Sequence, residues 1–245
     1  MATAVVPRPT RTSRGSRPGF VAVGLLSVAI AGWSLYLYAQ GTLAELATTE
    51  APNAGIAANY VGAPGFVQAA LYVHIVTGSL ALLLGPAQFS RRLRARRPRL
   101  HRVTGRAYFA VVGTAAICSL VMAPWNMGGM VGFFGFGTLG VLWLWTGARA
   151  LKAIRERDFA GHQAWTIRNY ALSFAAPTLR LWLGVLIVVQ IVASGGTLDP
   201  DAAFENAYAA VPFLCWLPNI VVAEWLVRRR GLPSYRVGQA APAAP

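Results

Sequence analysis

The amino-acid sequence predicts an all-α fold, a polytopic bundle of six transmembrane helices with both termini in the cytoplasm. The first observation is composition, because 56% of the 245 residues are hydrophobic and only 12% are charged. Such a chain lies outside the usual composition of soluble domains. The second is a series of apolar runs that reach the roughly 20 residues needed to cross a bilayer. The third is the position of the basic residues, which gather between alternate runs.

Six apolar runs define the expected transmembrane helices, since none alternates like a strand of a membrane barrel. We expect these helices at about 19–39, 66–89, 103–125, 130–151, 165–193 and 202–227. The first is a retained helix and not a signal peptide, because its apolar run is long and no cleavage site of small residues follows it. Residues 19–227 therefore form one transmembrane domain. Residues 1–18 and 228–245 are expected to be flexible cytoplasmic tails.

The basic residues indicate the orientation of this domain. All of them except Arg180 form four clusters, within 8–17, 91–106, 149–168 and 228–236, whereas segments 40–65, 124–130 and 194–208 contain no Lys or Arg. With six crossings, all four clusters lie on one side, and the positive-inside rule makes that side cytoplasmic. Topology thus explains the net charge of +14 without a nucleic-acid partner. The 91–102 loop could additionally attract anionic lipid headgroups.

Polar side chains inside an expected span are costly and therefore informative. In the fifth span, an unbroken helix would place His162, Thr166, Asn169, Ser173 and Arg180 on one face. We expect this face to look into the bundle, with Arg180, Asn169 and Ser173 lining a ligand pocket near His74. The alternative is that Arg180 only reaches outward to the membrane surface or bonds carbonyls freed by Pro177.

The chain contains only three histidines, and two of them begin nearly identical segments, HIVTG at 74–78 and HRVTG at 101–105. His101 and His162 begin the third and fifth spans at the cytoplasmic surface, whereas His74 lies in the outer half of the second. A glycine one turn after His74 and His101 allows either close helix packing or a flat ligand. Surface histidines also commonly bond headgroups or loop carbonyls, so both interpretations stay open.

Three segments of the chain are similar to a bacterial family of predicted membrane proteins of unknown function. They read HIVTGSLALLLGPAQF, LHRVTGRAYF and RDFAGHQAWTIRNYALSFAAPTLRLW, within residues 66–190. This resemblance implies a multi-pass protein of the bacterial inner membrane, and it implies no reaction.

The arrangement also resembles, by topology, the two-haem b-type membrane cytochromes, in which helices two and four hold one haem and helices three and five the other. That resemblance implies haem b as the cofactor, with His101 and His162 as axial ligands and His74 at the outer site. The fourth span departs from the pattern because it contains no histidine.

Three functions are compatible with the sequence. The best specific interpretation is a haem b electron-transfer protein. The alternatives are a permease or channel for a polar or anionic solute, which would use Arg180 and His74, and a non-catalytic accessory subunit packed against a partner in a membrane complex. The chain lacks a nucleotide-binding P-loop and a nucleophile elbow, so no enzymatic reaction and no separate metal site can be assigned.

Overall fold

The computed structural model describes residues 17–49 and 54–234, so most of the two predicted tails lies outside the described residues. The described residues form helices and turns without a strand. Six helical segments among them are long and apolar enough to cross a membrane, namely 18–38, 65–88, 98–125, 129–155, 175–193 and 200–229. The prediction of an all-α membrane bundle is therefore confirmed.

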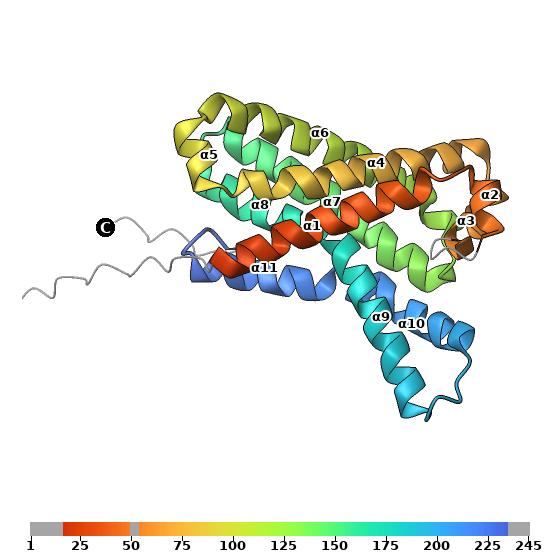
Figure 1. Cartoon of the computed structure of the whole chain (residues 1–245). Coiled ribbons are helices and arrows are strands. Elements are labelled where there is room, and N and C mark those ends of the chain that lie inside the picture. The colour runs from red at the N-terminus through yellow and green to blue at the C-terminus, as the bar shows by residue number, and fades with distance from the viewer. Residues whose placement is uncertain (1–16, 50–53, 235–245) are drawn as a thin grey trace, which may run out of the picture.

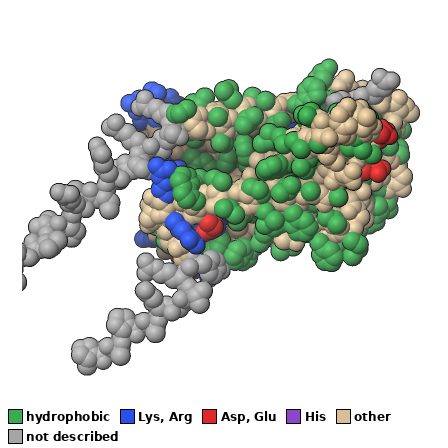
Figure 2. All heavy atoms as spheres, turned by 90° about the horizontal axis from the view of Figure 1, so that it is seen from below, with side chains coloured by type: hydrophobic (Ala, Val, Ile, Leu, Met, Phe, Trp, Pro, Cys, Tyr) green, Lys and Arg blue, Asp and Glu red, His purple; other side chains and the backbone are tan. Residues whose placement is uncertain are grey.

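Helices α1 and α4 lie side by side with α6, α7, α8 and α11 along the length of the molecule and form the bundle (Figure 1). Their bounds are Arg17–Tyr38 for α1, Gly65–Gln88 for α4, Pro98–Met122 for α6, Gly129–Arg155 for α7, Phe159–Ser173 for α8 and Leu217–Arg229 for α11. The short helix α5 (Arg91–Arg96) lies at one end, with the C-terminal turns of α7 and α11. We call this the basic end, and Figure 2 shows Lys and Arg gathered there beside a largely apolar surface.

The opposite end, here called the far end, carries two short helices, α2 (Leu43–Ala47) and α3 (Ala54–Val61), and the 3₁₀ turn η1 (Ala123–Trp125). Thr42 and Glu45 form a capping box that starts α2, and the hydrogen bond from the Thr42 backbone lowers the pKa of the Glu45 carboxyl. Leu43 and Leu46 are buried against the start of α4. The sequence predicted this segment only as an outer connection.

The core is formed by α4, α6, α7 and α8. Helix α6 packs between α4 and α7, and α8 packs against α7 and, over a shorter stretch, against α4. Helices α6 and α8 consequently face each other diagonally across the core, as do α4 and α7. Tyr108, Trp143 and Leu172 fill the space between the four helices, and α1 packs on the outer side of α4.

The structure interrupts both the fifth and the sixth span with a turn, so the unbroken helix expected in the fifth span was wrong. The sixth span, predicted at 202–227, is still found as a membrane-length segment over 200–229. Helix α8 ends at Ser173 and α9 (Ala175–Ala193) begins after Phe174, while α10 (Pro200–Leu214) and α11 are separated at Cys215 and Trp216. Prolines in the first turns of α9 and α11 favour new helix starts there, since the first turn needs no backbone donor. Helices α9 and α10 leave the bundle together as a hairpin (Figure 1).

Two side chains join the breaks to each other. Thr178 donates a hydrogen bond to the Cys215 carbonyl at 2.5 Å. The amide of Asn219 donates to the carbonyls of Ala171 and Cys215 at 3.1 and 3.0 Å. Carbonyls freed inside a membrane need such partners, so the two breaks support each other as one unit.

Candidate functional site

A buried hydrogen-bond network joins α6, α7 and α8 in the middle of the core. The Tyr108 hydroxyl donates to Asn169 Oδ1 at 2.7 Å and lies 3.0 Å from Ser173 Oγ. Trp143 Nε1 donates to Ser173 Oγ at 2.9 Å. Asn169 Nδ2 donates to the Trp143 carbonyl and to Thr146 Oγ1, both at 2.9 Å. The predicted pocket residues Asn169 and Ser173 therefore come together, and their polar atoms bond to other side chains.

His74 lies about 14 Å along α4 from its start at the far end. Its Nδ1 is 2.8 Å from the Ala115 carbonyl of α6. Its ring meets the edge of Trp143 at a centroid distance of 6.4 Å. Because a carbonyl only accepts, Nδ1 carries the proton and Nε2 has the free lone pair. A second haem, held by two histidines in the outer half, would need another imidazole on α7, the helix diagonally opposite α4. Trp143 occupies that place.

His162 stands in the first turn of α8 at the basic end. Its Nδ1 is 2.9 Å from the Ala150 carbonyl of α7, and its ring packs against Phe109 at 6.1 Å. The same reasoning assigns the proton to Nδ1 and leaves Nε2 free. A hydrogen bond from Nδ1 to a backbone carbonyl is the usual support of a histidine that binds a metal through Nε2.

His101 stands in the first turn of α6, diagonally across the core from α8. Its Nδ1 is the one buried side-chain nitrogen or oxygen without a hydrogen-bond partner among residues 17–49 and 54–234. The charges of Arg94, His162 and Arg102 all act on the His101 imidazole. The structure thus brings His101 and His162 to one end of the core.

Arg180 is separated from the other predicted pocket residues by the break at Phe174. Its guanidinium donates to the Ala176 carbonyl at 3.0 Å and to Ser34 Oγ of α1 at 2.8 Å. His74 and Arg180 therefore have different partners, and the structure does not bring them together as the predicted pocket required. The reason is that the break ends the regular repeat of α8, so Arg180 no longer shares a face with Asn169 and Ser173.

The comparison with known protein families matches residues 71–227, more than half of the chain, to the family described as "Predicted membrane protein (DUF2306)". The chain belongs to this family. No curated protein and no solved structure matches the chain. The comparisons therefore give no support to the resemblance to two-haem cytochromes. The region matched to the DUF2306 family contains all three histidines and the network around Asn169.

This DUF2306 member also contains a buried ion pair that the sequence reasoning missed. Arg168 of α8 donates from Nε to Glu224 Oε1 of α11 at 2.5 Å and from Nη2 to Oε2 at 2.9 Å. Its guanidinium lies over the ring of Trp165 at 4.7 Å. In the sequence, Arg168 is the last member of the basic cluster at 149–168, which does not predict its burial. The only available signal was that an acidic residue, Glu224, occurs in an apolar span.

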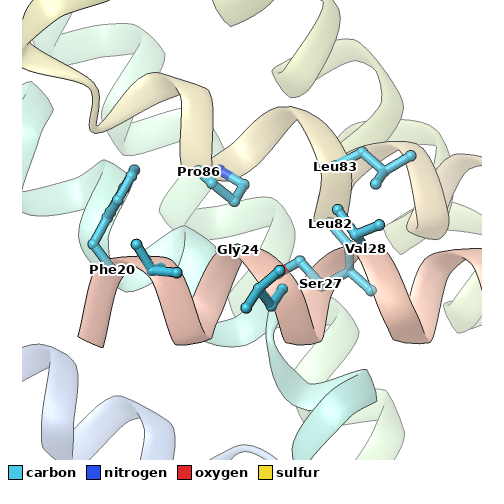
Figure 3. A pocket seen from close by; sticks show the side chains of 9 residues that line it. Phe20, Gly24, Ser27, Val28, Leu82, Leu83 and Pro86 are labelled. Atoms are coloured by element: carbon cyan, nitrogen blue, oxygen red, sulfur yellow. The ribbon is translucent and has the colours of Figure 1, made fainter. Parts of the chain in front are cut away.

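A shallow groove of about 290 Å³ lies between α1 and α4 toward the basic end (Figure 3). Its lining is apolar and includes Phe20, Leu82 and Pro86. At its base, the Ser27 hydroxyl lies 2.8 Å from the Tyr170 hydroxyl and donates to the Val23 carbonyl. Because Ser27 already has these partners, the groove fits a lipid acyl chain better than a polar headgroup in this DUF2306 protein.

Proposed function

We propose that this membrane protein transfers electrons and holds one b-type haem at the basic end, with His101 and His162 as axial ligands. The observation that carries the proposal is the pair of imidazoles on diagonally opposed helices. His162 bonds the Ala150 carbonyl through Nδ1, which leaves its Nε2 free, and His101 has a buried Nδ1 without a partner in the described part of the chain. Two neutral imidazoles are the donor set that b-type haem takes.

The surroundings of the two histidines also suit this group. Arg94 and Arg102 are close to His101 and can form charge-assisted hydrogen bonds to propionates. The Ala150 carbonyl fixes the tautomer and the orientation of the His162 ring. The haem itself would supply a reversible one-electron couple. Holding, orienting and charge-balancing the group are then the tasks of the chain.

Aromatic rings connect the proposed site with the far half of the bundle. Phe109 lies 6.1 Å from His162 and 5.1 Å from Tyr108, measured between ring centroids. Ser173 Oγ then bridges the Tyr108 hydroxyl and Trp143 Nε1, and Trp143 meets the His74 ring. These side chains form a row that extends from the proposed site to His74. His74 is not proposed as a ligand of a second haem.

The test is a reduced-minus-oxidised optical spectrum of the protein purified in detergent after expression with a haem supply. We expect the absorption bands of a six-coordinate b-type haem. His101→Ala and His162→Ala should each lose these bands, because each removes one axial ligand. His74→Ala is the matched control and should keep them. A colourless protein, or bands that survive both inner substitutions, would reject the haem site.

A permease remains the second candidate, favoured by the paired helix breaks. Transporters commonly form their binding sites at discontinuous membrane helices. Here α8 and α9 break beside α10 and α11, and Thr178 and Asn219 join the two breaks. The separation of Arg180 from His74 weakens this candidate, since the pocket it required does not form.

In this proposal the basic end faces the cytoplasm of a bacterial inner membrane, because the segments at the other end contain no Lys or Arg. We expect alkaline phosphatase fused after residue 55, 127 or 198 to be active. A fluorescent protein fused after residue 240 should fluoresce, as it does only in the cytoplasm. The reverse pattern at residue 55 would contradict this orientation.

A further inference from the structure

We propose that Arg180 forms a binding site for an oxyanion, a phosphate or carboxylate group, at the membrane interface of the far end. The site is separate from the proposed haem site, which lies at the basic end. It consists of the guanidinium of Arg180 on α9 and the hydroxyl of Ser34 on α1, which holds the guanidinium at 2.8 Å.

No carboxylate in the described part of the chain balances the charge of Arg180. Its two hydrogen bonds go to neutral acceptors, Ser34 Oγ and the Ala176 carbonyl. No carboxylate of residues 17–49 or 54–234 lies within ion-pair distance of it, since the ion pairs found there are Lys152–Glu156 and Arg168–Glu224. A partly buried guanidinium has five N–H donors, so donors remain for a ligand. Arg168 differs from Arg180 in this respect, because the carboxylate of Glu224 neutralises it with two hydrogen bonds.

The depth of the site points to the headgroup level. Ser34 precedes Tyr38, the last residue of α1, by four residues, or about 6 Å along the helix axis. Trp33 and Tyr36, the neighbours of Ser34 on α1, are both exposed on the outer surface of the bundle. Exposed Trp and Tyr of this kind mark the boundary between hydrocarbon and headgroups. An anion can therefore reach Arg180 without entering the middle of the membrane.

The chemistry of the ligand follows from the guanidinium. A planar fork of N–H groups matches two oxygens of a phosphate or carboxylate, and such bonds are strong where water is scarce. The group can come from an anionic phospholipid of the adjacent leaflet or from a free anion in solution. Both sources present the same oxyanion to Arg180, so the experiment must separate them.

The experiment measures the thermal stability of the purified protein in neutral detergent. Phosphatidylglycerol, phosphatidylcholine or inorganic phosphate is titrated in. Phosphatidylglycerol should stabilise the wild type, and Arg180→Leu should require at least about tenfold more of it for the same effect, as loss of a charged hydrogen bond implies. Inorganic phosphate that reproduces the full effect would assign the free anion as the source. Stabilisation by phosphatidylglycerol alone would assign the lipid.

Two variants keep the test decisive. Arg155→Leu, in the last turn of α7 at the basic end, removes an exposed charge of the same kind outside the 91–102 loop and should leave the Arg180-dependent effect unchanged. Ser34→Ala keeps the charge of Arg180 and removes only the hydrogen bond that positions its guanidinium. It should therefore weaken the stabilisation by phosphatidylglycerol to a smaller extent than Arg180→Leu. Ser34→Ala replaces Arg180→Leu in the test if Arg180→Leu does not fold. Equal titration curves for wild type, Arg180→Leu and Ser34→Ala would overturn the proposal.

Discussion

Replacing Glu224 with leucine is expected to lower the free energy of unfolding by about 3 kcal/mol, near the low end of the range for broken buried ion pairs. The substitution leaves the guanidinium of Arg168 charged and without its carboxylate, and only 5% of that side chain is exposed. The effect stays near the low end because the Glu224 side chain is 34% exposed and water screens part of the interaction. The measurement is an unfolding titration from mild detergent into sodium dodecyl sulfate.

Two further variants isolate the ion pair. Glu224→Gln keeps one oxygen as an acceptor for Arg168 and should fall between wild type and Glu224→Leu. The double variant Arg168→Met with Glu224→Leu removes both charges and should recover most of the loss, because two apolar side chains need no compensation. If Glu224→Leu were as stable as the wild type, the pair would contribute nothing to the fold.

Gly85→Ala is expected to destabilise the protein by about 1–3 kcal/mol, the usual effect of an overpacked core. A Cβ at this position would lie 2.0 Å from Cε2 of the Tyr170 ring. The ring would have to move, which would break the 2.8 Å contact between its hydroxyl and Ser27 and disturb its packing on Phe89. The same detergent titration measures the change.

Gly78→Ala is the matched control on the same helix, because no atom lies within 4 Å of a Cβ built there. This variant should retain wild-type stability or gain slightly from the higher helix propensity of alanine. Combining Gly85→Ala with Tyr170→Leu should restore part of the loss, since the clashing ring is absent. Equal stabilities of the two glycine variants would show that α4 can move away from α8 at little cost.

Much of the architecture could be predicted from the sequence because hydropathy and charge act locally. The six spans and the basic end follow from stretches of about 20 residues considered one at a time. The inward face of α8 is also local, since Thr166, Asn169 and Ser173 recur at helical spacing and are all buried. The sequence likewise predicted that His101 and His162 stand at the same end of the bundle.

The remaining features depend on partners far away in the chain. Arg168 is buried because Glu224 neutralises it from another helix. The break at Phe174 depends on Thr178 and Asn219, which bond carbonyls of both broken spans. Once that break is present, Arg180 turns to Ser34 of α1, a residue 146 positions away. Helical periodicity alone cannot predict any of these contacts.

The hairpin of α9 and α10 has a consequence for the bilayer itself. At the basic end, the fifth and sixth spans lie within the bundle as α8 and α11, whereas beyond the two breaks they spread away from it (Figure 1). The protein therefore displaces more lipid area in the leaflet at the far end than in the opposite leaflet.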